Sequence, residues 1–180
     1  MVQGILHFNI EDMKLFNFIF AIFIGLSAQA QPKPEDILKE INTFRKGQGL
    51  TQAILKPGQC KAAQLQAEWI ATTGINEHIQ TQPVNGKPLL KMPWDRGDFY
   101  GVTVVAENLF EVPKSITAKQ VVDGWINSPG HKLNMMYGVP SELECHVGIA
   151  IVPIKSNSND VIIVLVIGDN VDHKTGQIRH

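Results

Sequence analysis

An uncharged apolar run near the N-terminus decides which part of the chain folds and in which compartment. Residues 15–26 carry no charge, Lys14 precedes them, and an Ala-Gln-Ala sequence at 28–30 follows. A basic residue, a short apolar segment and a small-residue cleavage site in this order are typical of a secretory signal peptide. The run is shorter than the roughly 20 apolar residues that a membrane-spanning helix needs.

The sequence therefore predicts an exported protein that is secreted or periplasmic. Residues 13–30 form the predicted signal peptide, and 1–12 are an upstream extension, because their two acidic residues are unusual in a signal peptide. The alternative is that the apolar run is a buried helix of the folded domain. Cleavage leaves residues 31–180, a length that suits one domain. We expect this domain to span 31–170, followed by a polar tail at 171–180.

The charge of the mature chain excludes some partners. The whole chain has 16 Lys and Arg against 17 Asp and Glu, and residues 1–30 contain one Lys and two acids, so 15 of each remain. No basic block is present, so the sequence predicts no nucleic-acid partner and no binding to an anionic membrane. We also expect no integral membrane segment after cleavage. The sequence indicates no particular protein partner.

Two cysteines remain after cleavage, Cys60 and Cys145. In an oxidising compartment an isolated pair is a candidate disulfide. The bond would contribute about 4–5 kcal/mol in the chain-entropy model, since the loop that it closes is long. The alternative is a pair of buried free thiols. We expect the disulfide.

The pattern of apolar residues predicts an α+β fold. Amphipathic segments and helix-start signals predict helices at 34–46, 59–72 and 117–127, and a short helix that begins at Ser128-Pro129. Apolar and β-branched segments predict strands at 102–110, 147–151 and 161–167, with a long loop at 81–100 and a turn at 155–160. Because helices come first and then mix with strands, we expect antiparallel strands with helices on both faces.

Three short clusters carry the residues that could perform chemistry. His78 follows the second predicted helix, Glu107-Asn108 lies in a predicted strand, and a W-x-x-S-P-G-H-x-x-N run spans 125–134. In this order after a signal peptide, they resemble the CAP family of cysteine-rich secretory proteins, antigen 5 and pathogenesis-related proteins. The W-x-x-S-P-G-H-x-x-N run looks like the bacterial-type branch, also called SCP-domain proteins. The resemblance covers residues 37–169.

The resemblance implies a three-layer α-β-α sandwich with a cleft that contains two histidines and an acidic residue. By motif position these are His78, His131 and Glu107. A second glutamate of the family corresponds to Ser128 here, as is common in the bacterial-type branch. The long cysteine-rich extension of animal members is absent, so their channel-directed functions are not implied.

The same residues support a ligand site on chemical grounds. His131 would lie in the first turn of its helix, where the positive end of the helix dipole disfavours a protonated imidazole. Neutral imidazoles and a carboxylate suit Zn²⁺, and an oxygen-rich site completed by water could accept Mg²⁺. Each residue also has a plain structural alternative: His78 as a surface or capping residue, Glu107 as the partner of a lysine, and His131 as a helix cap.

Other residues in the motifs are expected to be structural. Ser128 is predicted to be an N-cap rather than a nucleophile. Trp69 and Trp125 are predicted core residues, and Asn108 and Asn134 are predicted to form structural hydrogen bonds. Three further histidines have no assignment, because His146, His173 and His180 match no family motif.

Two functions follow from these residues. The first is a secreted, non-enzymatic scaffold or effector whose cleft binds a divalent metal or a small ligand, including a lipid. The second is an extracellular hydrolase or peptidase that uses His78, Glu107 and His131, through a metal-bound water if a metal is present. Binding is favoured, because nucleophilic catalysis needs an activated Ser or Cys and no G-x-S-x-G elbow is present.

Overall fold

The apolar run near the C-terminus forms the central strand of the sheet. In the computed structural model, β4 (Asp160–Asp169) lies between β3 (Cys145–Pro153) and β2 (Ala106–Pro113) and is antiparallel to both. The short β1 (Ala53–Leu55) completes the order β1-β3-β4-β2 and runs parallel to β3. The sheet is therefore mixed at one edge, which the sequence did not indicate.

The structure describes residues 31–138, 143–172 and 175–178. The predicted signal peptide and the extension before it lie outside these residues, as do His173 and His180. Within the described part, no helix is both long and apolar enough to span a membrane. The tail contains a two-stranded ribbon, formed by β5 (Val171–Asp172) and β6 (Gln177–Ile178).

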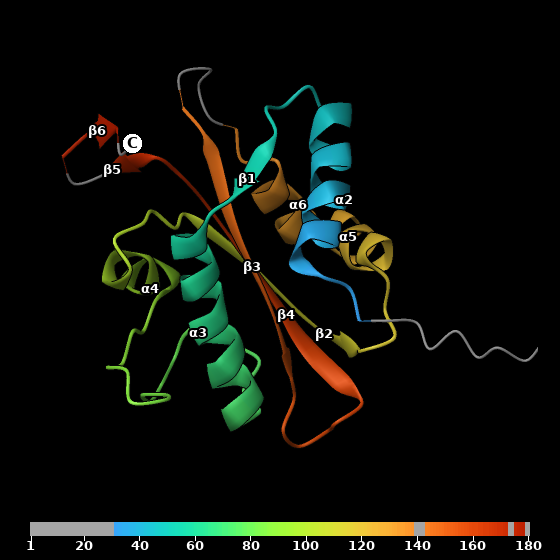
Figure 1. Cartoon of the computed structure of the whole chain (residues 1–180), viewed down its shortest axis with the longest axis vertical. Helices are drawn as coiled ribbons and strands as arrows, with labels where there is room; N and C mark the ends of the chain where they lie inside the picture. The colour runs from blue at the N-terminus through green and yellow to red at the C-terminus, as the bar shows by residue number, and fades with distance from the viewer. Residues whose placement is uncertain (1–30, 139–142, 173–174, 179–180) are drawn as a thin grey trace, which may run out of the picture.

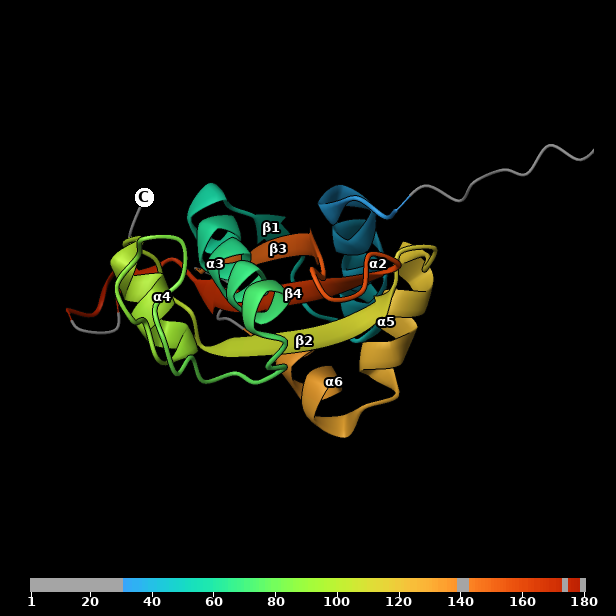
Figure 2. The ribbon, with the colours of Figure 1, turned by 90° about the horizontal axis from the view of Figure 1, so that it is seen from below.

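Helices cover both faces of the sheet (Figure 1). The described helices are α2 (Pro34–Gly47), α3 (Pro57–Thr73), α4 (Pro93–Phe99), α5 (Ala118–Ile126) and α6 (Pro129–Met135). Seen from below, α3 and α6 lie on opposite sides of the strands (Figure 2). The expected α-β-α sandwich is thus confirmed.

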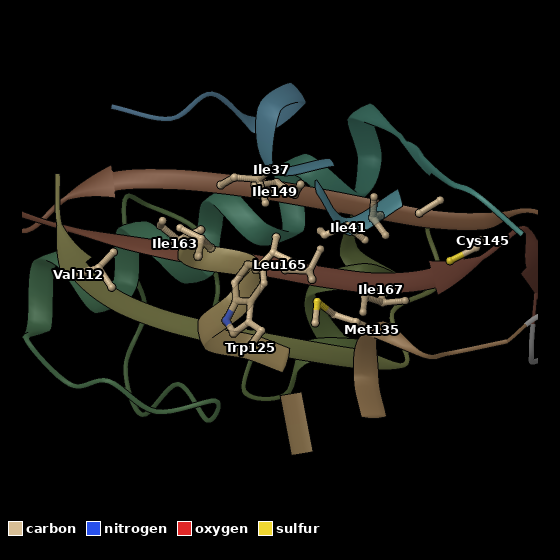
Figure 3. Packing of buried hydrophobic residues seen from close by; sticks show 14 of the residues in the cluster. Ile37, Ile41, Val112, Trp125, Met135, Cys145, Ile149, Ile163, Leu165 and Ile167 are labelled. Carbon is tan, nitrogen blue, oxygen red and sulfur yellow. The ribbon is translucent and has the colours of Figure 1, made fainter. Parts of the chain in front are cut away.

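Strand β4 is buried on both faces because its side chains alternate between two cores. Ile163, Leu165 and Ile167 pack with residues of α2, α5 and α6, among them Ile41 and Trp125 (Figure 3). The residues between them pack against α3, whose Trp69 is also fully buried. A strand with two such neighbours needs apolar residues throughout, which explains its continuous apolar sequence. Both tryptophans are core residues, as predicted.

Several element boundaries follow directly from local sequence. Proline stands at the start of four helices, where its missing N–H is not needed. Helix α5 begins instead with a capping box, in which Thr117 and Gln120 bond reciprocally. Helix α3 ends at Gly74, whose φ of 70° is the left-handed conformation that glycine adopts most readily.

Two predicted elements need correction. The strand expected at 102–110 begins only at Ala106 and continues to Pro113. The segment expected to be a loop at 81–100 contains α4, a single short helix that begins with a proline. Its seven residues are too few for hydrophobic periodicity to show, so its proline and glycine dominated the sequence signal.

The two cysteines do not form the predicted disulfide. Both are free: Cys60 lies on α3, and Cys145 lies on β3 within the core beneath α2, α5 and α6. Because α3 packs on the other face of the sheet, the sheet separates the two thiols. Burial raises the pKa of both, so each stays protonated at neutral pH.

Candidate functional site

The cleft is organised by a buried ion pair between α4 and β2. Glu107 lies on β2, and Arg96, which is fully buried, donates from Nη2 to Glu107 Oε2 at 2.7 Å. The same guanidinium donates to the carbonyl oxygen of His78 at 3.2 Å. Its Nη1 donates to the carbonyls of Leu90 and Lys91. Arg96 therefore neutralises the buried carboxylate and fastens three segments around it.

His78 contacts the other oxygen of the same carboxylate. Its Nδ1 lies 2.9 Å from Glu107 Oε1, and its side chain is 47% exposed, whereas that of Glu107 is 1% exposed. A carboxylate that accepts from Nδ1–H leaves Nε2 as the acceptor nitrogen of the neutral ring. In the neutral ring, Nε2 of the half-exposed His78 is thus left as a hydrogen-bond acceptor, while Glu107 fixes the orientation of the ring.

Buried amides hold the segment that carries His78. Gln66 on α3 donates to the carbonyl oxygen of Glu77 at 2.6 Å, and Gln80 donates to Gln66 Oε1 at 3.0 Å. The backbone N–H of Gln80 also donates to the carbonyl oxygen of Lys91. Both glutamines are fully buried. The segment on either side of His78 is therefore fixed by hydrogen bonds, although it has no regular secondary structure.

Two asparagines attach α6 to β2. Asn108 donates to the carbonyl oxygen of His131 at 3.0 Å. Asn134 donates to the carbonyl oxygen of Glu107 at 3.2 Å and to Asn108 Oδ1 at 2.8 Å. Both residues thus form the structural hydrogen bonds that the sequence predicted. Their contacts place the side of α6 next to the edge strand that carries the acidic residue.

His131 lies on α6 and is half-buried. Burial lowers its pKa, and the nearby charge of His78 lowers it further. Ser128 occupies the N-cap position of this helix as predicted, but its side chain makes no capping hydrogen bond. The helix is held instead by Asn108 and Asn134. The predicted capping role of the Ser128 hydroxyl is therefore wrong.

A cleft of about 280 Å³ lies beside this cluster. His78, Glu107 and Asn134 supply its polar lining, and its apolar lining includes Met92, Trp94 and Val105. Trp94 is 52% exposed and Val105 is 40% exposed, so the apolar rim is open to solvent. No Ser, Thr or Cys belongs to the lining among the described residues. His131 is not a lining residue either.

The side chains as arranged do not suit a divalent metal ion. Both oxygens of Glu107 already accept hydrogen bonds, one of them from the permanently charged Arg96, whose cation would repel a second one. Across the described part of the chain, no group of three or more His, Cys, Asp or Glu side chains could hold a metal ion. Metal ligation by His78, Glu107 and His131 stays a prediction without support from this geometry.

The sequence identified His78, Glu107 and His131 but not Arg96, the cation that pairs with Glu107. His78 and Glu107 are in direct contact, and His131 lies close enough to His78 for the charge of His78 to lower the pKa of His131. Arg96 was not identified, because it lies in the segment that was expected to be a loop. A lone arginine among prolines and glycines gives no signal of its own. Only the helical conformation of α4 brings it into contact with Glu107 on β2.

Comparisons with solved structures agree with this architecture. An outer surface protein from Borrelia burgdorferi has a TM-score of 0.55 and 21% identity, and the match covers 75% of this chain and 92% of that one. An extracellular protein containing a SCP domain from Bacillus anthracis has a TM-score of 0.51 and 15% identity, covering 73% of this chain and 39% of that one. At these identities the likeness shows the fold alone. No curated protein sequence matches the chain.

An α-β-α sandwich with a histidine–glutamate pair at the edge strand of its sheet is the architecture that the resemblance to the CAP family implied. The sequence model of the cysteine-rich secretory protein family, CAP, matches residues 38–167. That range includes every helix and strand from β1 to β3, as well as His78, Glu107 and His131. The chain belongs to the CAP family.

Proposed function

We propose that this protein is an exported, non-enzymatic binding protein whose cleft takes a small ligand with a polar group and an apolar part. The observation that carries the proposal is the mixed lining of the cleft. His78 and Asn134 contribute polar atoms to it, and the exposed Trp94 and Val105 contribute apolar surface. Lipids are one class of molecule that combines a polar group with an apolar part.

The polar group of the ligand should be a hydrogen-bond donor. Glu107 holds Nδ1 of His78, so Nε2 of the neutral ring can accept a hydrogen bond. A hydroxyl group satisfies this requirement. The apolar part then covers Trp94 and Val105, and removal of their surface from water provides about 25 cal/mol per Å². A fatty alcohol is the simplest molecule that meets both conditions.

Tryptophan fluorescence can test this directly. The chain contains three tryptophans, of which Trp69 and Trp125 are fully buried, so a ligand in the cleft should change the emission of Trp94. We expect 1-octanol to change it saturably, and its methyl ether, which has no donor, to bind more weakly. Substitution His78→Ala should remove this difference between the alcohol and the ether.

A matched pair of apolar variants locates the binding. Val105→Ala should weaken binding of 1-octanol by about three- to tenfold, because it removes apolar surface from the cleft. Ile54→Ala is the control, since Ile54 is equally exposed but lies on β1 at the opposite edge of the sheet. The proposal is wrong if 1-octanol leaves the emission unchanged, or if the two variants behave alike.

A hydrolase is the second candidate, and one observation favours it. The contact between His78 Nδ1 and Glu107 is the arrangement of a general base and the group that orients it. The cleft lacks a Ser, Thr or Cys among its described lining residues, so water would have to be the nucleophile. Hydrolysis of a chromogenic ester that disappears in His78→Ala, in protein that is still folded, would establish this function in place of binding alone.

The place of action is part of the proposal. The predicted signal peptide at 13–30 supports export, and two structurally similar proteins are described as outer surface and extracellular. Mass spectrometry of the protein from the culture medium or periplasm should give an N-terminus at Gln31. Retention of residues 15–26 in that material would contradict cleavage.

A further inference from the structure

Another cavity, of about 420 Å³, lies between α3 and the segment 87–100, which contains α4. Helix α4 lies beside α3 (Figure 1). The cavity shares no lining residue with the cleft, and none of the sequence motifs includes its residues. Its volume falls within the range of roughly 300–1,000 Å³ that is usual for small-molecule pockets.

One face of α3 forms most of the wall of this cavity. Because residues three and four positions apart lie on the same side of a helix, five lining residues share this face. They are Cys60, Lys61, Gln64, Leu65 and Glu68. The opposite side of the same turns is mostly alanine and is buried in the core between α3 and the sheet. Helix α3 therefore presents charged, amide and apolar side chains to the cavity.

The lining changes from apolar to charged between the buried and the exposed parts of the cavity. Leu65 is only 3% exposed, and Tyr100 is half-buried. Burial also raises the pKa of the Tyr100 hydroxyl, with a smaller contribution from the charge of Glu68. Lys61 and Lys87, by contrast, are exposed. A ligand would therefore place its apolar part inside the cavity and its polar group at the opening.

The turn that carries Lys87 is fastened to α3. The backbone N–H of Lys87 donates to the carbonyl oxygen of Val84 at 2.9 Å, which closes the turn. Within this turn, the side chain of Asn85 donates to Oε2 of Glu68 on α3. Lys87 Nζ lies 5.9 Å from the centroid of the Phe99 ring, close enough for a cation–π contact. These contacts hold Lys87 beside the cavity.

The carboxylate of the lining is held by neutral groups and not by its lysines. Gln64 donates to Oε1 of Glu68 at 2.8 Å, and Asn85 donates to Oε2. Within the part of the chain that the structure describes, neither Lys61 nor Lys87 forms an ion pair.

The charges of the lining favour an anion. Its charged side chains are two lysines and one glutamate, so the lining carries one excess positive charge. An anion that enters the cavity displaces no carboxylate of the protein, because the lysines are not engaged by Glu68. The lysine ammonium is a compact point charge without the paired geometry of a guanidinium, so carboxylates and sulfonates both suit it.

We propose that this cavity binds a small organic anion whose charge lies at one end of an apolar body. The charged group lies at the opening, near Lys61 and Lys87, and the apolar body lies against Leu65 and Tyr100. The cavity is separate from the cleft, so this inference does not depend on the function proposed for the cleft.

The two thiols of the purified protein can report whether the cavity is occupied. Cys60 is half-buried and lines the cavity, whereas Cys145 is 1% exposed. Iodoacetamide should therefore alkylate Cys60 in the folded protein, but slowly, since burial raises the pKa of this thiol. Mass spectrometry of peptides after timed alkylation gives the rate at Cys60. Alkylation of Cys145 in the same sample would reveal unfolding.

2-Naphthoate is the probe, and it should slow the alkylation of Cys60 saturably at millimolar concentrations. 2-Naphthamide has the same rings without the charge and should bind about fivefold more weakly. Acetate has the charge without the apolar body and should give no protection at the same concentrations. Added sodium chloride should weaken protection by 2-naphthoate but not by 2-naphthamide, because salt screens exposed charges.

Variants of the lysines test the charge directly. Lys61→Gln and Lys87→Gln should each weaken the binding of 2-naphthoate about threefold, and the double variant should bind the acid and the amide about equally. Lys39→Gln is the matched control, since Lys39 is exposed on α2, which packs on the other face of the sheet. This variant should protect Cys60 as the unaltered protein does.

Several results would overturn the inference. One is a Cys60 that iodoacetamide does not reach in the free protein, because the cavity would then be closed. The others are an alkylation rate that 2-naphthoate leaves unchanged, equal affinity for 2-naphthoate and 2-naphthamide, or Lys61 and Lys87 variants that behave like Lys39→Gln. Since Cys145 shows whether each variant is folded, general loss of structure cannot imitate the expected pattern.

Discussion

Arg45 and Arg96 are both buried, but they donate hydrogen bonds to different kinds of acceptor. Among the described residues, Arg45, at the end of α2, donates only to backbone carbonyls, those of Thr51, Met135 and Tyr137. Arg96 also donates to backbone carbonyls but adds a carboxylate, that of Glu107. The first arginine fastens α2 to the end of α6. The second arginine also allows the charged carboxylate of Glu107 to be buried in the wall of the cleft.

The difference shows how a structural residue becomes part of a binding site. A buried guanidinium surrounded by carbonyls links chain segments through hydrogen bonds, and its removal leaves neutral acceptors unpaired. A buried guanidinium opposite a carboxylate also holds a charge away from water, so its removal leaves that charge uncompensated. On the cleft side, stability and the orientation of His78 therefore depend on the same pair.

The largest expected effect is that of Arg96→Met. It should destabilise the protein by about 3–5 kcal/mol at pH 7, because Glu107 stays buried without its cation. The loss should shrink in acid, where the orphaned carboxyl group can take up a proton and lose its charge. Urea unfolding at pH 7 and pH 4.5 measures both values. An equal loss at the two pH values would contradict a charge effect.

Arg45→Met should have a smaller effect, roughly 1–3 kcal/mol, because its acceptors are neutral carbonyls that can partly turn to water. The loss should be the same at pH 7 and pH 4.5. The same urea experiment serves as the control for the Arg96 variant. A strong pH dependence here would remove the distinction between the two arginines.

The smallest expected effect is the pH dependence that comes from His131. Burial, and then the charge of His78, lower its pKa, so its NMR titration should have a midpoint below the usual value of about 6.5. Between the lowered pKa and 6.5, the unfolded chain binds more protons than the folded one. Stability should therefore fall as the pH drops through this window. His78→Gln should raise the midpoint, and an unchanged midpoint in that variant would contradict the effect of His78. A midpoint of 6.5 or above in the unaltered protein would contradict the lowered pKa.

The sequence predicted the parts of the fold that depend on long, regular patterns. The helices at 34–46 and 117–127 lie within one or two residues of α2 and α5, and the apolar strand at 161–167 lies within β4. In a strand that is buried on both faces, or in an amphipathic helix of about three turns, the pattern of apolar residues is long enough to predict the element. The seven-residue α4 and the three-residue β1 are too short for such a pattern.

The site was predictable only where a motif carried it. Glu107 and His78 came from the family resemblance, and their contact is present. The partner on the other side of the carboxylate, Arg96, depends on the missed helix. The disulfide was wrong for a related reason, because spacing along the chain does not reveal that Cys60 and Cys145 face opposite sides of the sheet.

The claim that Arg96 and Glu107 act as one unit is tested most directly by a double-mutant cycle. Unfolding free energies would be measured at pH 7 for the unaltered protein, Arg96→Met, Glu107→Leu and the double variant. We predict that the double variant is more stable than the sum of the single losses implies, by about 2–3 kcal/mol, since neither residue is then left as an uncompensated charge. Losses that add to within about 0.5 kcal/mol would show that the pair is not coupled.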